Sequence, residues 1–287
     1  MAARAVHACA RKAETKPVLE EDGAAVGLVQ LLHTYTIQIR RGQEMEDMTL
    51  HSDPANAFGY CLGNTLWSAA PVLIDYLTTC ADDALVGKHC LELGCGLGAV
   101  GMAAAMHGAA EVLLTDMPQM QRLLQLNISS NMAKFPASTR VHSAVLDWRT
   151  VETSRVVGAS TCRSKRSSAV SGPQDDSACT TCSSWDVVLA ADVVYDERLF
   201  EPLWRTLEAV ADHETVIYLA LPNRESEAGT STADHDELSE PFTDLDKFLS
   251  MAPWCNEIFD CTVRLRRAYE PQQSVVHIIE VRRQSKA

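Results

Sequence analysis

The stretch "HCLELGCGLGAVGM", residues 89 to 102, decides the fold of this chain. An apolar strand runs into three glycines, Gly94, Gly96 and Gly98, and then into a helix of small residues. Glycine allows a tight turn and lets a ligand approach the backbone without a Cβ in the way. A strand, a glycine-rich turn and a helix in this order are typical of a site for a nucleotide-like ligand. The glycines alone do not say which one.

From residue 88 onward, strands and helices alternate. Near-continuous apolar strands separated by helices are typical of a parallel sheet covered on both faces. The last two strands are joined by the short turn "EPQQ", so they must be antiparallel. We therefore predict an α/β fold with five parallel strands, a sixth strand reached through a helix, and a reversed seventh strand. The predicted strands are residues 88–94, 111–116, 140–148, 185–192, 214–224, 257–269 and 275–283, and the predicted helices are 98–108, 118–132, 197–213 and 242–253.

An N-terminal β-hairpin is predicted ahead of this alternation. Residues 33–41 alternate in polarity and are predicted to pair with residues 47–52 through the polar turn 41–46, and a helix is predicted over 63–80. The predicted organisation is a disordered tail (1–28), a hairpin extension (29–60) and one domain (61–287). Inside that domain, residues 153–184 are rich in Ser, Thr, Gly and Cys without periodicity and predict a low-complexity insertion. Residues 225–240 predict a second polar insertion.

Composition narrows the class of protein. The 287 residues carry a formal net charge of −13, which argues against nonspecific binding to nucleic acid. No apolar run approaches the roughly 20 residues that span a bilayer, so we predict no membrane contact. The ten cysteines come without a secretory signal, which favours reduced thiols and a cytoplasmic location. Cys162, Cys179 and Cys182 supply only three thiols without a second CxxC, so we predict no metal site.

Acidic residues around the glycine turn bear on the choice of ligand. Asp116 ends the second predicted strand, where its carboxylate could accept the hydroxyls of a ribose, and Asp192 ends the fourth. Gly94, Gly96 and Ala99 also satisfy the permissive dinucleotide-binding fingerprint. Glu92, just before the glycines, would repel a pyrophosphate but suits a ligand with an ammonium and a sulfonium group. The sequence therefore favours S-adenosylmethionine over a dinucleotide.

Five segments in order carry a resemblance to a known family: "LWSAAPVLIDYL" (66–77), "LELGCGLGAVGMAAA" (91–105), "LLTDMPQMQRLLQLNISSN" (113–131), "LDW" (146–148) and "ADVVYDERLFEPL" (191–203). Together they resemble the family 16 seven-β-strand (class I) S-adenosylmethionine-dependent protein-lysine methyltransferases. Within that family the chain is most similar to the valosin-containing-protein lysine methyltransferase branch. The resemblance implies a Rossmann-like methyltransferase sheet of seven strands with an antiparallel last strand, and a class I methyltransferase domain over 61–287.

The resemblance also implies roles for particular residues. It places Asp192 and Tyr195, of the family's Asp-x-x-Tyr motif, at the acceptor side as candidate catalytic residues. Ser68 departs from the acidic residue that relatives often carry, and the insertion 153–184 is longer than the family pattern leads us to expect. The candidate cofactor-binding residues, with Glu92 taken from the charge argument above, are Trp67, Glu92, Gly94, Cys95, Gly96, Asp116, Trp148 and Ala191.

Each candidate residue has a purely structural alternative. Asp116 could cap the helix that begins near Pro118, and Trp67 and Trp148 could be ordinary core aromatics. Tyr195 could simply pack in its loop. His107, His142 and His277 have no partners at metal-ligand spacing and are predicted to be structural. The acidic loop 234–240 could bind a basic segment of a substrate or be merely solvated.

The resemblance implies that the chain methylates a lysine side chain of a partner protein. An AAA-type ATPase or a chaperone is the partner that analogy with the branch suggests. Two alternatives stay open from the sequence: methylation of arginine, histidine or a small molecule, and a non-catalytic adaptor that binds S-adenosylmethionine. For lysine, we expect Asp192 to orient the incoming amine and Tyr195 to wall its channel. Whether Asp192 also takes the proton is left open.

Overall fold

The fold is described here from a computed structural model. Its described residues are 11–13, 32–79, 81, 84–150, 185–223, 244–250, 258–269 and 274–284. The predicted insertions 153–184 and 225–240, including Cys162, Cys179 and Cys182, lie outside these residues, as does most of the predicted tail.

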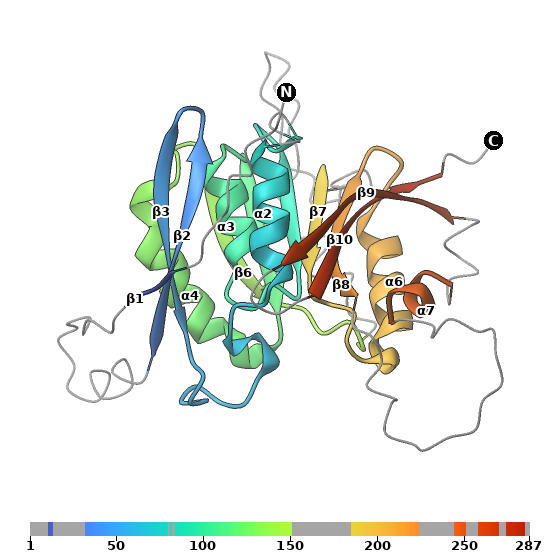
Figure 1. Cartoon of the computed structure of the whole chain (residues 1–287), viewed down its shortest axis with the longest axis horizontal. Helices are drawn as coiled ribbons and strands as arrows, with labels where there is room; N and C mark the ends of the chain where they lie inside the picture. The colour runs from blue at the N-terminus through green and yellow to red at the C-terminus, as the bar shows by residue number, and fades with distance from the viewer. Residues whose placement is uncertain are drawn as a thin grey trace, which may run out of the picture.

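A seven-stranded sheet forms the centre of the molecule, with the strand order β6-β5-β4-β7-β8-β10-β9 (Figure 1). Strands β4 to β8 are parallel to one another, and β10 lies antiparallel between β8 and β9. The prediction of five parallel strands, a sixth reached through a helix and a reversed seventh is therefore confirmed. The strands are β4 (His89–Leu93), β5 (Glu111–Asp116), β6 (Arg140–Val145), β7 (Val187–Ala191), β8 (Val216–Asn223), β9 (Phe259–Tyr269) and β10 (Ser274–Arg283).

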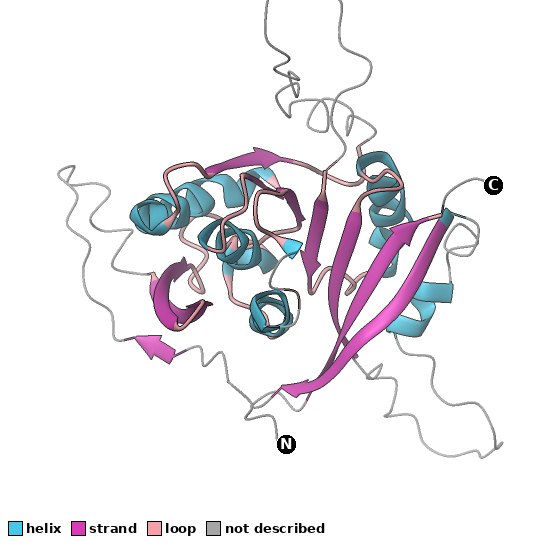
Figure 2. Cartoon of the chain, turned by 90° about the horizontal axis from the view of Figure 1, so that it is seen from above, coloured by secondary structure: helices cyan, strands magenta, loops and turns pink. Residues whose placement is uncertain are grey.

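Helices cover the sheet on both faces, as Figure 2 shows from above. The apolar side chains of α2, α3 and α4 share one buried core with one face of the sheet, and those of α6 and α7 share a second core with the other face. Among the described residues, no helix has both the length and the apolar character needed to cross a bilayer. The helices are α2 (Ala69–Thr79), α3 (Ala99–Met106), α4 (Gln121–Asn131), α6 (Phe200–Val210) and α7 (Asp244–Ser250), and the 3-10 turns are η1 (Leu62–Asn64), η3 (Pro118–Met120), η4 (Met132–Lys134) and η5 (Glu197–Leu199).

The helix predicted over 63–80 is shorter in the structure. Residues 62–64 form η1, residues 65–68 are not helical, and α2 begins only at Ala69. Trp67 therefore lies in the connection rather than on the helix. Its indole Nε1 donates a hydrogen bond to the Leu62 carbonyl oxygen at 2.8 Å, so this segment folds back on itself next to the glycine turn.

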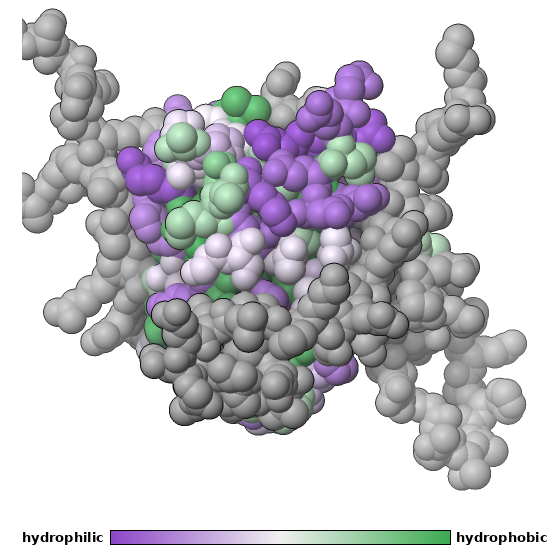
Figure 3. Space-filling model, turned by 90° about the vertical axis from the view of Figure 1, so that its left-hand side faces the viewer, coloured by the Kyte–Doolittle hydropathy of each residue, from purple (hydrophilic) through white to green (hydrophobic). Residues whose placement is uncertain are grey.

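The predicted hairpin is present as β2 (His33–Arg41) and β3 (Glu44–Ser52). The turn is two residues long, not the polar 41–46, because Arg41 already pairs with Glu44. Ile37, Ile39, Met48 and Leu50 are fully buried in the core shared with α2, α3 and α4. Figure 3 views this side of the molecule and shows largely hydrophilic residues with smaller apolar areas on the visible surface.

Three residues of the predicted tail are ordered as a strand. β1 (Arg11–Ala13) pairs antiparallel with β2. The tail prediction is thus wrong for these three residues. An exposed strand edge offers unpaired backbone groups, and a short third strand satisfies them.

Two asparagines of α4 attach the hairpin to the domain. The Asn131 side chain accepts from the Thr49 amide at 2.9 Å and donates to the Thr49 carbonyl at 2.6 Å. Asn127 does the same for His51 at 2.7 and 3.1 Å, and also donates to the Leu97 carbonyl. Because the two asparagines lie one helical turn apart and alternate residues of β3 share an edge, the helix supplies the polar partners that another strand would supply.

Candidate functional site

A cavity of about 720 Å³ opens at the edge of the sheet where the parallel strands end. Residues that directly follow β4, β6 and β7, and the last residue of β5, all line it. The carboxyl ends of the strands in an open α/β sheet are the usual place for a ligand. All ten candidate site residues predicted from the sequence line this one cavity: Trp67, Glu92, Gly94, Cys95, Gly96, Asp116, Trp148, Ala191, Asp192 and Tyr195.

The glycine turn needs glycine for its backbone and for its neighbours. Gly94, Gly96 and Gly98 have φ of 58°, 51° and 78°, the left-handed region that other residues rarely adopt. A Cβ on Gly94 would lie 2.9 Å from the Trp148 ring. A Cβ on Gly96 would lie 3.2 Å from the Gly63 carbonyl oxygen, so the segment around η1 lies directly on the turn.

Glu92 is buried at the junction of β4 and α3. Its carboxylate accepts a hydrogen bond from the Gly101 amide at 2.7 Å, which stabilises the first turn of α3. The pKa of Glu92 is raised to about 8, chiefly by burial and in part by the Asp116 charge, with hydrogen bonds from backbone amides opposing the rise. The residue therefore has a structural contact that the sequence did not reveal, in addition to its place on the cavity wall.

Asp116 holds the glycine turn in place. One carboxylate oxygen accepts from the Gly96 amide and the other from the Met117 amide, both at 2.7 Å. Burial raises the pKa of Asp116, and these two amide hydrogen bonds lower it. The cap-like alternative is not seen, because Asp116 binds the amide of Met117, which precedes η3, and η3 has no side-chain cap hydrogen bond. A carboxylate oxygen has further lone pairs, so Asp116 can still accept from a ligand.

Two tryptophans, Trp67 and Trp148, line the cavity. Trp67 is 38% exposed and is held by its hydrogen bond to Leu62. The Trp148 ring lies against Gly94, and within the described part of the chain its buried Nε1 has no hydrogen-bond partner. An indole N–H without a partner at the wall of a cavity is a donor that a ligand can satisfy.

The segment after β7 carries the two candidate catalytic residues. Asp192 is 7% exposed and has φ of 61°, and its amide donates to the Ala220 carbonyl at 2.9 Å. A non-glycine residue in this region is strained, and such strain clusters at functional sites. Tyr195 is 43% exposed on the rim, and partial burial, with the nearby Asp116 charge, raises its pKa.

Sequence reasoning missed several residues that line the same cavity. Cys61, Gly63 and Leu66 come from the segment before α2, and two Asp-x-Arg pairs come from the segments after β6 and β7. The pairs are Asp147 with Arg149 and Asp196 with Arg198. A repeat of Asp-x-Arg after two successive strands was visible in the sequence, but its meaning depends on where the strands lie in the sheet.

The charges inside the cavity distinguish between the two ligands considered from the sequence. Among the described residues, no lysine, arginine or histidine forms an ion pair with Glu92 or Asp116. Two buried carboxyl groups with raised pKa values would oppose a pyrophosphate, whereas a cationic ligand with ribose hydroxyls would relieve both. The residues present therefore fit S-adenosylmethionine.

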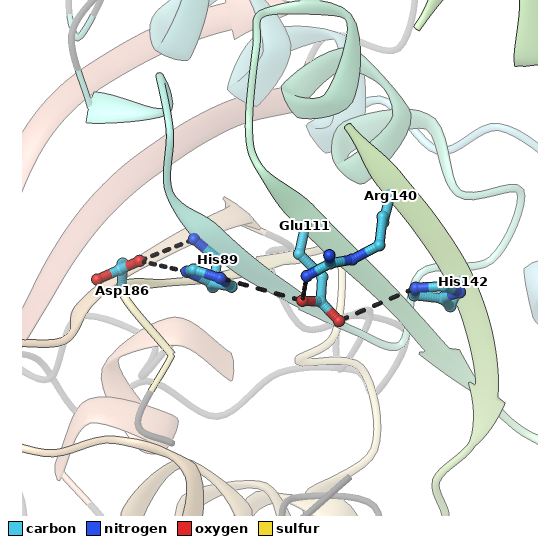
Figure 4. Close-up of polar contacts among 5 residues, drawn as sticks. All are labelled: His89, Glu111, Arg140, His142 and Asp186. Atoms are coloured by element: carbon cyan, nitrogen blue, oxygen red, sulfur yellow. Dashed lines mark hydrogen bonds and ion pairs between the residues drawn. The ribbon is translucent and has the colours of Figure 1, made fainter. Parts of the chain in front are cut away.

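A second polar cluster lies at the opposite edge of the sheet, where the strands begin (Figure 4). The Glu111 carboxylate accepts from Arg140 Nη2 at 2.8 Å and lies 4.0 Å from His89 Nε2 and 3.9 Å from His142 Nε2. His89 also lies 3.1 Å from the Asp186 carboxylate. These contacts pair residues of adjacent strands, in agreement with the structural role predicted for His142. No three of the described side chains form a group that could hold a metal ion.

Comparison with known proteins agrees with this geometry. The model of a family described as lysine methyltransferase matches residues 45–161 and 173–235, more than half of the chain. Mouse protein-lysine methyltransferase METTL21E is 30% identical over 162 residues, which cover 56% of this chain and 57% of that protein. Mouse EEF1A lysine methyltransferase 3 is 31% identical over 61% of this chain and 62% of its own length. The matched part thus spans about three fifths of these relatives.

The solved structures that match are more distant. The magnesium protoporphyrin IX methyltransferase of Synechocystis PCC 6803, with bound SAH, is 15% identical, with a TM-score of 0.45 over 76% of this chain and 84% of that one. The narrower placement in the valosin-containing-protein branch is not tested by these matches and stays a prediction. The family match covers the glycine turn, Asp116, Trp148 and the Asp192–Tyr195 motif in order, and the chain therefore belongs to the lysine methyltransferase family.

Proposed function

We propose that this chain is an S-adenosylmethionine-dependent methyltransferase that acts on a lysine side chain of a partner protein. One observation supports it most strongly: the cavity at the carboxyl edge of the sheet holds two buried carboxyl groups, Glu92 and Asp116, that form no ion pair among the described residues. The family match and the names of the relatives support the same reading.

Cofactor-binding roles follow from the site. S-adenosylmethionine, when bound, supplies an activated methyl group on a sulfonium. Asp116 would accept from its ribose, Glu92 would face its ammonium group, and Trp148 would wall the adenosine. The Gly94–Gly96 turn allows the ligand to lie against the backbone.

Acceptor-side roles belong to Asp192 and Tyr195. A free lysine amine has a pKa near 10.4, so it must lose a proton before it can attack. Asp192, held at a strained backbone position on the cavity wall, would accept a hydrogen bond from the amine and orient it. Tyr195, on the rim, would border the channel through which the side chain enters. Alignment of the two reacting groups supplies much of the rate enhancement in such transfers.

Two observations bear on the partner protein. The branch resemblance suggests an AAA-type ATPase or a chaperone, and one relative is named as a lysine methyltransferase of EEF1A. A cytoplasmic location is supported by the free thiols of Cys61, Cys90, Cys95 and Cys261.

The test is methyl labelling. The purified chain is incubated with tritiated S-adenosylmethionine and a cell lysate, and the labelled residue is identified by mass spectrometry. Labelled lysine in one or a few proteins supports the proposal. Labelled arginine, histidine or small molecules would replace the acceptor, and binding of adenosylhomocysteine without any labelling would favour the adaptor alternative.

A further inference from the structure

The mouth of the cavity carries two copies of one local arrangement. In Asp147-Trp148-Arg149 the guanidinium donates hydrogen bonds to the Asp147 carboxylate from Nε at 2.9 Å and from Nη2 at 2.7 Å. In Asp196-Glu197-Arg198 the same two atoms contact the carboxylate at the same distances. In both, the aspartate also accepts from the arginine's own backbone amide at 3.0 Å. Both arginines line the cavity.

Each arginine is held in one orientation by its aspartate, which does not engage all of its N–H donors. The guanidinium has five N–H donors, and the aspartate engages only Nε and Nη2, so Nη1 makes no hydrogen bond within the described part of the chain. The Arg149 side chain is 59% exposed and the Arg198 side chain 89% exposed. An exposed ion pair adds little to stability. A fixed geometry that leaves outward donors free is instead suited to binding a carboxylate.

The arginines flank the tyrosine of the acceptor motif. Tyr195 directly precedes Asp196, and the charge of Arg149 acts on its phenol group. The interior of the cavity is acidic, with Glu92, Asp116 and Asp192 on its wall, whereas the donors at the mouth are cationic. A substrate that matches this pattern has an amine that enters and a carboxylate that stays at the mouth.

We propose that Arg149 and Arg198 select protein substrates in which an acidic residue lies close to the methyl-accepting lysine. The inference rests on the proposed function and specifies its substrate class. The chain carries a net charge of −13, which on average repels an acidic partner. The two arginines would bind an acidic residue next to the substrate lysine and so offset this repulsion locally. They would thereby make the affinity depend on the residues that flank the lysine.

Fluorescent nonapeptides with a central lysine test this inference through binding, which does not require turnover. Aspartate, alanine or lysine occupies the flanking positions, and affinity is measured by fluorescence anisotropy with adenosylhomocysteine present. We expect the wild type to bind aspartate-flanked peptides about tenfold more tightly than alanine-flanked ones. Arg198→Glu and Arg149→Glu should each remove this preference and favour lysine-flanked peptides.

Arg205→Glu is the matched control. Arg205 is an exposed arginine on α6 paired with Glu201 at 2.5 Å, and it does not line the cavity. Equal affinity of the wild type for the three peptide sets, or the same loss in Arg205→Glu, would overturn the inference. So would a loss of adenosylhomocysteine affinity in calorimetry, because the arginines would then serve the cofactor. Incubating the same peptides with S-adenosylmethionine separates the two claims. Methylated lysine without a preference for the aspartate flank would overturn the inference alone, whereas a binding preference without any methylated lysine would count against the proposed function on which the inference rests.

Discussion

The two edges of the central sheet treat carboxyl groups in opposite ways. Where the strands begin, Glu111 pairs with Arg140, which balances its charge, and two histidines lie beside it (Figure 4). Where the strands end, Glu92 and Asp116 are buried with backbone amides as their hydrogen-bond donors. Burying a carboxyl group without a nearby cation costs free energy. The burial of Glu92 and Asp116 therefore reduces the stability of the unliganded protein.

The comparison distinguishes acidic residues that stabilise the fold from acidic residues that serve the binding site. Paired charges at the first edge stabilise the contact between adjacent strands. Unpaired buried acids at the second edge store electrostatic free energy that a cationic ligand can release. Removing a buried acid where the strands end should therefore preserve or raise stability and impair ligand binding or activity, whereas removing the paired acid where the strands begin should lower stability and leave activity unchanged.

The largest effect is expected for Asp192→Asn. Asparagine tolerates the left-handed φ of 61° at this position, so the fold should be kept while the negative charge is lost. We expect methyl transfer to fall by about 100-fold or more, with adenosylhomocysteine affinity measured by calorimetry changed less than about threefold. Turnover close to that of the wild type would remove Asp192 from the reaction.

Glu92→Gln should stabilise the unliganded protein. The pKa of Glu92 is raised from 4.5 to about 8, so the folded state holds a proton that the unfolded state releases between these values. The free energy of unfolding of the wild type should therefore fall as the pH rises through this window. The variant lacks this slope and should be more stable by a few kcal/mol above pH 8, as measured by urea unfolding.

The same variant should bind the cofactor less well. If Glu92 meets the ligand's ammonium group, adenosylhomocysteine binding at pH 7 releases up to about one proton from the wild type. Calorimetry in buffers of different ionisation enthalpy measures this release, and Glu92→Gln should lose it. An identical proton count in both proteins would place the ammonium group elsewhere in the cavity.

Glu111→Gln should act at the other edge and in the other direction. The variant loses the charge that Arg140 balances, so the free energy of unfolding should fall by about 1 kcal/mol. Methyl transfer per folded molecule should not change. A loss of activity larger than the loss of folded protein would contradict the division between the two edges.

The smallest effect is expected for His142→Ala. The side chain is 53% exposed and lies 3.9 Å from Glu111, and exposed pairs of this kind contribute less than about 1 kcal/mol. Urea unfolding should show a change in the free energy of unfolding below about 0.5 kcal/mol. A greater loss would mean that His142 supports the cluster more strongly than its exposure suggests.

Much of the fold and the site could be predicted because the signals are local. Apolar strands alternate with helices, and the glycine turn and the acids directly follow strands, so a parallel arrangement brings them to one edge. That reasoning placed the glycine turn, Glu92, Asp116 and Asp192 at one cavity, and the family resemblance added the remaining candidates, Trp67, Trp148, Ala191 and Tyr195, which line the same cavity. It placed the start of α2, the hairpin turn and β1 less well, because pairing of the backbone across strands decides where such elements begin.

The sequence by itself determined the alternation of elements, the glycine turn and the residue types at the ends of the strands, since each depends on neighbours a few positions away. Only the tertiary structure decided that Asn127 and Asn131 complete the edge of β3, that Gly63 lies on Gly96, and that two Asp-x-Arg pairs meet at one mouth. The first two of those contacts join residues between 33 and 82 positions apart in the sequence. They form only when the sheet and its helices have packed around a common core.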